Sequence, residues 1–186
     1  MADRALGPRL NRIQQAYWHT VPGAACDRGD ARLNMRTVTA ELDGNGLRLV
    51  ARTGGGHTIV MDDADGDAGP QPAELLVVAQ AGCTAMDVVA ILRKQRRAFR
   101  RYRIQVIGEQ RDDPVPHVFE QVRIVHVVDG PVDIAALRRA IELSATKYCV
   151  VSANLAAGVT TIRHAYLLYD SDGEEHYGEV VVTMRT

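Results

Sequence analysis

The most constraining part of this sequence is a long apolar stretch with a cysteine near its middle. It begins at Pro72 and continues to Leu92 with few polar interruptions. Proline suits the first position of a helix because its missing N–H would have no partner there, and Glu74 then meets the positive end of the helix dipole. A helix that is apolar on every face is normally buried by the rest of the fold. We therefore expect a core helix, with Cys83 within it or at its edge.

The details of this stretch limit where the helix can lie. Gln80, Thr84 and Asp87 interrupt the apolar run and leave it too broken for a membrane span. The run ends in the cation-rich residues 93–97, which suit the negative C-terminal end of a helix. Gly82, next to the cysteine, favours a close backbone approach, a kink or a restart of the helix.

The overall composition favours one cytoplasmic domain. The chain has 186 residues and a formal net charge of −1. This is ample length for one core, and the balanced charge argues against a dedicated binder of nucleic acid or of acidic membranes. No apolar run follows Met1, so we expect neither a secretory signal nor a membrane anchor.

The residue types that often carry chemistry leave several interpretations open. Cys26, Cys83 and Cys149 are too few and too widely spaced for a disulfide scaffold, and in a reducing compartment they are buried spectators, catalytic thiols or metal ligands. A zinc site of these cysteines and a histidine lacks a short ligand pair, so we expect no metal. His126 lies in an apolar strand, and we expect a hydrogen-bonded core histidine. The acidic run 62–67 lacks the spacing of an EF-hand, which favours a solvated loop.

Strand and helix patterns flank the central stretch. Residues 43–46 read Asp-Gly-Asn-Gly, a strong hairpin signal because these residues tolerate positive φ. Residues 117–128 are apolar on both faces and should form a strand inside a sheet. A second helix is expected after Asp133, which suits an N-cap, with apolar residues recurring to Ala145. The other predicted strands are residues 35–42, 47–52, 57–61, 101–109, 160–169 and 179–183.

The first 34 residues differ in pattern from the rest. Apolar residues recur there at helical spacing, from Leu6 to Tyr17, with polar residues between them. We expect an amphipathic arm, residues 1–34, that lies on the domain or on a partner subunit. A partly disordered tail is the alternative. The main domain would then be residues 35–186.

Two motifs carry a resemblance to a known family. One is P-x-x-L…A-G-C-T-A from Pro72 to Ala85, and the other is A-x-x-L-S…K-Y-C from Ala140 to Cys149. In these motifs and in the order of its elements, the chain resembles the OsmC/Ohr family, whose names denote osmotically induced protein C and organic hydroperoxide resistance protein. The resemblance covers about residues 35–161, which leaves out the arm and the C-terminal hairpin, residues 162–186.

The resemblance implies an α+β fold in which antiparallel sheets pack around a buried central helix and two chains interlock into a homodimer. It also implies a thiol peroxidase that reduces organic hydroperoxides, is recycled by an external thiol reductant and uses no other cofactor. By position, Cys83 would attack the peroxide, and Cys149 would resolve the sulfenic acid as a disulfide. Cys26 has no counterpart in the family motifs.

Two positions depart from the family pattern. In the peroxidases a glutamate follows the motif proline, whereas here Ala73 follows it and the acid is Glu74, about 100° further round the helix. Glu74 is therefore our candidate for the catalytic glutamate. The family arginine near the end of the third strand is missing from residues 58–63. The nearest substitutes are Arg36, Arg48, Arg52 and His57.

These departures keep a second function open. Without the activating arginine, the thiol would react slowly because reactivity follows the thiolate fraction. The alternative is a non-catalytic protein that binds a hydrophobic small molecule in the dimer cleft, with the cysteines as remnants or sensors.

Overall fold

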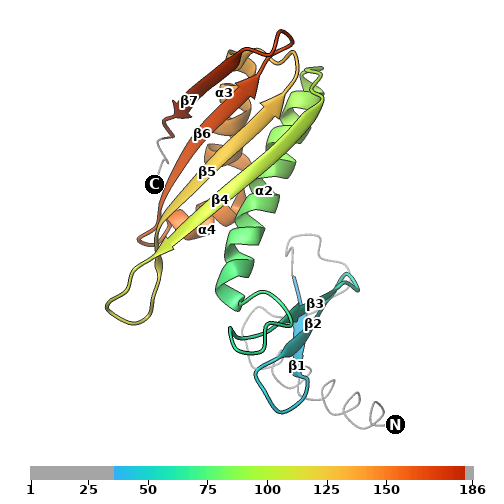
Figure 1. The fold of residues 1–186 in the computed structure, drawn as a ribbon, viewed down its shortest axis with the longest axis vertical. Helices are drawn as coiled ribbons and strands as arrows, with labels where there is room; N and C mark the ends of the chain where they lie inside the picture. The colour runs from blue at the N-terminus through green and yellow to red at the C-terminus, as the bar shows by residue number, and fades with distance from the viewer. Residues whose placement is uncertain (1–35, 183–186) are drawn as a thin grey trace, which may run out of the picture. The chain divides into compact units, whose positions relative to one another are not determined.

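The computed structural model describes residues 36–182 and has an α+β architecture (Figure 1). The predicted arm, residues 1–34, and Cys26 lie outside these residues. The chain divides into two compact units.

The N-terminal sheet has three strands in the order β1-β2-β3, namely Val38–Leu42, Leu49–Thr53 and Thr58–Met61. The predicted hairpin at 43–46 is confirmed. Asp43 N–H donates to Arg48 O at 2.9 Å, and Gly44 has a φ of +92°. The side chains of Asp43 and Arg48 also pair at 2.8 Å. The strand predictions were therefore correct to within a few residues.

The loop between β3 and the helix is more ordered than the solvated loop that we expected. Asp62 is buried, and its carboxylate accepts hydrogen bonds from the N–H groups of Asp63 and Ala68. Asp63 accepts in the same way from Asp65 and Gly66. The first two acids of the run thus hold the loop, while residues 64–67 are exposed as predicted.

The larger part consists of a long helix, a four-stranded sheet and a helical crossover. Its strand order is β4-β5-β6-β7, and the helices lie against one face of the sheet (Figure 1). The helical elements are α2 (Pro72–Lys94), α3 (Ile134–Leu143), the π-helical turn η1 (Ser144–Tyr148) and α4 (Val150–Ala156). The strands are β4 (Arg101–Gln110), β5 (Phe119–Asp129), β6 (Thr161–Tyr169) and β7 (Glu175–Val180).

The four-stranded sheet is mixed, so the expectation of antiparallel sheets is wrong here. Strands β5 and β6 run parallel, with Val125 opposite Ala165, whereas the β4–β5 and β6–β7 pairs are antiparallel. The reason is the connection between the strands. A short loop returns the chain in the opposite direction, but the crossover through α3, η1 and α4 carries it back to the starting end of the sheet.

The helix termini follow their sequence signals. Gln71 N–H donates to the Glu74 carboxylate at 2.8 Å, which completes a capping box before Pro72 at the first helical position. Asp133 caps α3 as predicted, because its carboxylate accepts from Ala136 N–H at 2.7 Å. Helix α2 runs unbroken from Pro72 to Lys94, so the expected kink or restart at Gly82 does not occur.

The second half of the crossover was not predicted. Helix α3 ends at Leu143, two residues before the expected end of the apolar periodicity, and the short helix α4 follows the π-helical turn. The cap of α4 is Cys149, a residue type that is not a usual N-cap signal. The last strand also lies earlier than predicted, at Glu175–Val180.

A single chain does not bury every face of α2, contrary to our expectation. The buried stripe consists of Gln80, Thr84, Val88 and Leu92, which recur every four residues. On the other faces the exposed fractions are 47% for Leu76, 60% for Val78 and 74% for Met86. By length and composition, α2 is the one helix of the described residues that could cross a membrane. Its polar residues Gln80 and Thr84 nevertheless pack into the protein.

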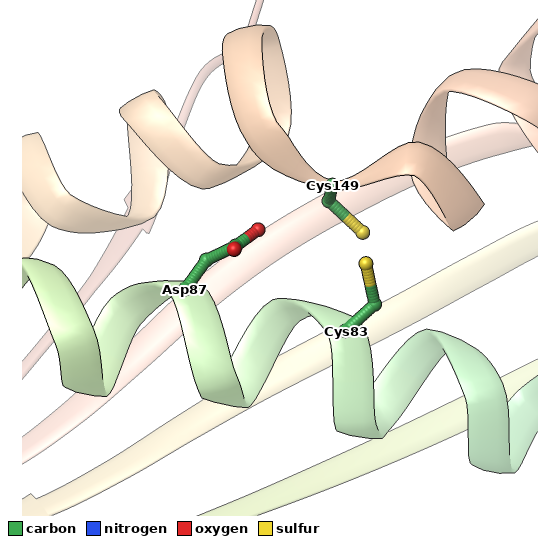
Figure 2. Close-up of side chains that lie close together, drawn as sticks. All are labelled: Cys83, Asp87 and Cys149. Carbon is green, nitrogen blue, oxygen red and sulfur yellow. The ribbon is translucent and has the colours of Figure 1, made fainter. Parts of the chain in front are cut away.

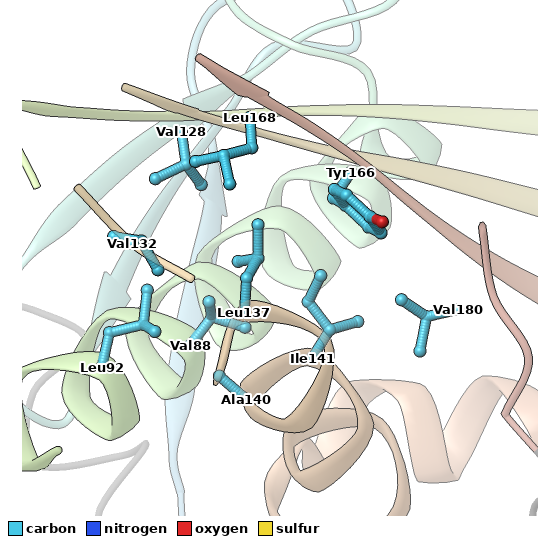
Figure 3. Packing of buried hydrophobic residues seen from close by; sticks show 10 residues of the cluster. All are labelled: Val88, Leu92, Val128, Val132, Leu137, Ala140, Ile141, Tyr166, Leu168 and Val180. Atoms are coloured by element: carbon cyan, nitrogen blue, oxygen red, sulfur yellow. The ribbon is translucent and has the colours of Figure 1, made fainter. Parts of the chain in front are cut away.

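The main core lies between the helices and the sheet (Figure 3). Helices α2 and α3 meet there through Val88 and Leu92 on one side and Leu137 and Ile141 on the other. Strands β5 to β7 close the other side of the same cluster. Its buried members are Val88, Leu92, Val128, Val132, Leu137, Ala140, Ile141, Tyr166, Leu168 and Val180.

Leu137→Ala should lower the free energy of unfolding by about 2–5 kcal/mol, because it leaves a cavity in this fully buried cluster. Chemical denaturation measures the change. The matched control on the same helix is Arg139→Ala, which loses only an exposed ion pair with Glu142 and should cost about 0.5 kcal/mol or less. Equal losses in the two variants would contradict this core assignment.

Candidate functional site

The structure brings Cys83 and Cys149 together, although 66 positions separate them in the sequence. Cys83 lies in the middle of α2, and Cys149 lies between η1 and α4. Figure 2 shows the two sulfur atoms facing each other across the gap between these elements. The Sγ atoms lie within 4.8 Å of each other, and both residues are free thiols. The expectation that the two cysteines approach each other is confirmed.

The backbone around Cys149 has an unusual conformation that turns its side chain toward α2. The π-helical turn closes with a hydrogen bond from Cys149 N–H to Ser144 O at 2.8 Å. Such turns are rare and often occur at functional sites. Cys149 then leaves the helical conformation and becomes the N-cap of α4. Its Sγ atom accepts a hydrogen bond from Ser152 N–H at 3.3 Å.

A buried polar group surrounds the Cys149 sulfur. The Gln80 amide donates to Thr84 Oγ1 and to Ser152 Oγ, each at 2.8 Å. The same amide lies 3.8 Å from Cys149 Sγ, and Thr84 Oγ1 lies 3.5 Å from it. Gln80, Thr84 and Ser152 are almost completely buried. From the sequence, the first two were only interruptions of an apolar run.

The part of the chain that carries both cysteines is similar to known proteins. Residues 64–163, which include both cysteines, match the family model described as "OsmC-like protein". The chain belongs to the OsmC-like protein family. The Escherichia coli protein YhfA is 37% identical over 122 residues, which are 65% of this chain and 90% of YhfA.

Solved structures of OsmC-like and related proteins share the fold. A hypothetical protein from Aquifex aeolicus superimposes with a TM-score of 0.67 at 28% identity, over 75% of this chain and 99% of that one. An organic hydroperoxide resistance protein OsmC from Legionella pneumophila superimposes with a TM-score of 0.54 at 13% identity, over 72% and 97% of the two chains. At the latter identity the likeness concerns the fold alone.

The two thiols of this OsmC-like protein have different environments. Burial raises the pKa of Cys149, but hydrogen bonds from Ser152 and Thr84 outweigh it, and the pKa lies below its ordinary value. Burial raises the pKa of Cys83 above its ordinary value, and its neighbours Cys149 and Asp87 act in the same direction. Of the two thiols, Cys149 is therefore the first to become a thiolate.

Asp87 is a member of the site that sequence reasoning missed. It lies one helical turn after Cys83, its carboxylate accepts a hydrogen bond from Ser144 Oγ at 3.0 Å, and burial raises its pKa. The spacing of four residues on one helix was the available signal. Ligand atoms of Cys83, Asp87 and Cys149 all lie within 4.8 Å of one another. Thiolates and a carboxylate can bind Zn²⁺, but a closed tetrahedral site needs a fourth ligand.

The structure does not bring the third predicted site residue, Glu74, to the thiols. Nine positions separate Glu74 from Cys83 on one unbroken helix, which corresponds to about 13 Å along its axis. Glu74 is exposed, and its carboxylate caps the helix. Within a single chain we therefore assign Glu74 to the helix cap.

The candidate substitutes for the family arginine belong to the N-terminal strands and turns. Arg48 pairs with Asp43, and Arg52 donates to Thr58 Oγ1 at 3.3 Å. Their role toward Cys83 stays a prediction, as does that of Arg36 and His57.

The more buried thiol, Cys149, should ionise at lower pH than Cys83. In Cys83→Ser, which retains Cys149, thiolate absorbance should appear at lower pH than in Cys149→Ser, which retains Cys83. Adding Thr84→Val to Cys83→Ser should raise the pKa of Cys149, because a donor to the thiolate is lost. Ultraviolet titration measures all three variants. A higher pKa for Cys149 in Cys83→Ser than for Cys83 in Cys149→Ser would contradict the conclusion that hydrogen bonds stabilise the Cys149 thiolate.

Proposed function

We propose that this OsmC-like protein is a thiol peroxidase that reduces organic hydroperoxides by cycling Cys83 and Cys149 between dithiol and disulfide. The observation that carries the proposal is the pair of free thiols within 4.8 Å of each other. The substrate class is the one that the resemblance to the OsmC/Ohr family implies, and the family match agrees with that resemblance. The cytoplasm is the compartment in which such a cycle would run, because thiols are kept reduced there.

In this mechanism Cys83 attacks the peroxide, because it is the more accessible sulfur. Cys149 is only 3% exposed, whereas Cys83 is half-buried. The Cys149 thiolate accepts the Cys83 proton, and the Cys83 thiolate attacks the distal oxygen of ROOH. The O–O bond breaks, and the alkoxide takes up a proton and leaves as ROH. The thiolate of a thiol with a raised pKa is a strong intrinsic nucleophile, but the raised pKa also lowers the fraction of Cys83 that is thiolate, so we expect slow turnover.

The second step forms the disulfide. Cys149 loses its proton again readily, because its hydrogen-bond donors stabilise the thiolate. Its sulfur attacks the Cys83 sulfenic acid, the S–O bond breaks, and the oxygen leaves as water. The sum of both steps converts two thiols and ROOH into a disulfide, ROH and water. An external dithiol then reduces the disulfide by exchange.

We also propose that the functional unit is a homodimer. The exposed apolar residues Leu76, Val78 and Met86 leave apolar surface on more than one side of α2, which water would cover in an isolated chain. A second copy of the chain that packs on α2 would bury this surface and would also restrict access to the thiol pair.

In sedimentation experiments the protein should therefore have twice its chain mass of 20.3 kDa. Met86→Glu places a charge on the proposed interface and should shift the equilibrium toward the monomer. Arg139→Glu, at an exposed position of α3, is the matched control and should leave the dimer intact. A wild-type protein that is a folded monomer at micromolar concentration would rule out the dimer.

The cysteine variants test the catalytic cycle. With cumene hydroperoxide and dithiothreitol, Cys83→Ser should lose turnover, because no sulfenic acid can form at position 83. Without dithiothreitol, Cys149→Ser should permit one oxidation and then over-oxidise to the sulfinic acid, because no second thiol intercepts the Cys83 sulfenic acid. Consumption of peroxide and mass spectrometry of the intact protein measure the two outcomes. Cys26→Ser is the matched control and should retain turnover.

The second candidate function is non-catalytic binding of a hydrophobic small molecule, and the raised pKa of Cys83 is the observation that favours it. The same experiment separates the two functions. Equal, slow peroxide consumption by the wild type and Cys83→Ser would mean that the thiol pair is no enzyme. A sulfenic acid on Cys149 in Cys83→Ser would instead reverse the roles of the two cysteines.

A further inference from the structure

A hydrogen-bond chain of three side chains, the half-buried Tyr102 and the buried His126 and His164, crosses three strands of the four-stranded sheet. Tyr102 on β4, His126 on β5 and His164 on β6 lie on neighbouring strands. Tyr102 Oη lies 2.6 Å from His126 Nδ1, and His126 Nε2 lies 3.4 Å from His164 Nδ1. The two imidazole rings stack at 5.7 Å between centroids, and their exposed fractions are 0% and 3%. The prediction that His126 is a hydrogen-bonded core residue is confirmed.

The side chains of Tyr102, His126 and His164 are uncharged at neutral pH. Burial lowers the pKa of His126 to about 3 and that of His164 to about 4. Burial raises the pKa of Tyr102, so its hydroxyl keeps its proton. A neutral imidazole has one nitrogen that donates and one that accepts. The direction of each hydrogen bond in the chain is therefore linked to that of the next.

The tyrosine sets this direction. Of the described residues, His126 is the hydrogen-bond partner of the Tyr102 hydroxyl. The phenol is the more acidic of the two neutral groups, so we assign it as the donor and His126 Nδ1 as the acceptor. The proton of His126 then lies on Nε2 and points to His164 Nδ1, which also accepts. As a result, His164 carries its proton on Nε2.

His164 Nε2 is buried and has no partner among residues 36–182. His164 also lines a cavity of about 220 Å³ at the junction of α4 and β6. A buried donor without an acceptor costs free energy, which a bound molecule would recover. The other lining residues, none of them charged, are Ala145, Ser152, Ala156, Thr160, Thr161, Ile162 and Val182.

We propose that this cavity binds a small uncharged molecule whose carbonyl oxygen accepts a hydrogen bond from His164 Nε2–H. The uncharged lining favours a neutral ligand, and Ala145, Ala156 and Ile162 provide apolar walls for its carbon skeleton. Two of the three lining hydroxyls are engaged, because Thr160 donates to Phe119 O at 2.7 Å and Ser152 Oγ accepts from Gln80, and the third belongs to the exposed Thr161. His164 Nε2 is therefore the buried donor left for the ligand. Ser152 lines this cavity and also donates to Cys149, but neither thiol lines the cavity, and the proposal does not depend on the sulfur chemistry.

Cyclopentanone and cyclopentene are suitable probes, because they share ring size and differ in the acceptor. In full-length protein labelled with ¹⁵N-histidine, long-range ¹H–¹⁵N spectra should show the Nε2–H tautomer at both His126 and His164. Cyclopentanone should shift the His164 Nε2 resonance with a dissociation constant on the order of 1 mM, as expected for six heavy atoms. Cyclopentene should bind about tenfold more weakly, because it leaves the donor unpaired.

Two variants test the role of the hydrogen-bond chain. His164→Phe keeps a ring in place but removes the donor, so the preference for the ketone should disappear. Tyr102→Phe leaves the cavity lining unchanged and removes the group that fixes the tautomer, so the ketone should bind a few-fold more weakly and a mixture of tautomers should appear. Equal binding of both probes to the wild type would overturn the proposal. A wild-type His164 that is protonated on Nδ1, or that does not respond to cyclopentanone because only water occupies the cavity, would also overturn it.

Discussion

The contact between α2 and the helical crossover holds the larger part of the molecule together and also creates its site. One stripe of α2 contributes both halves of this contact. Toward the C-terminal end, Val88 and Leu92 pack into the apolar cluster with α3. Two turns earlier, Gln80 and Thr84 replace apolar packing by hydrogen bonds to the segment around Cys149. Core packing and thiol chemistry therefore depend on the same alignment of two elements, and a shift of α2 along its axis would disturb both.

Much of the fold could be predicted from local signals, and the missing parts have identifiable physical causes. The Asp43–Gly46 hairpin, the start of α2 and the Asp133 cap all depend on the chemistry of a few adjacent residues, which a sequence displays directly. The parallel β5–β6 pair and α4 depend on how the chain returns after α3, which periodicity does not encode. Similarly, apolar residues on every face of α2 indicate burial, but a single chain covers only one stripe.

The two cysteines of the site could be predicted from the sequence, but the residues that contact their sulfur atoms could not. The family motifs identified Cys83 and Cys149, and their proximity follows from the fold. The order of their pKa values does not, because it depends on Thr84 and Ser152, which contact Cys149 only after the chain folds. Glu74 illustrates a residue with two possible roles. An acid in the first turn satisfies both a catalytic pattern and a capping box, and in the single chain the cap is what it forms.

The π-helical turn before Cys149 has a consequence for how this site can be gained or lost. A π-turn holds one residue more than the α-helical turn that it replaces, and each residue advances the chain by about 100° around the helix axis. Deleting a single residue between Ser144 and Tyr148 would let α3 continue as a regular helix and would rotate the Cys149 sulfur away from α2. The thiol pair thus depends on the length of the chain at this point as much as on the identity of the residues, and the loss of one residue would leave each cysteine without its partner.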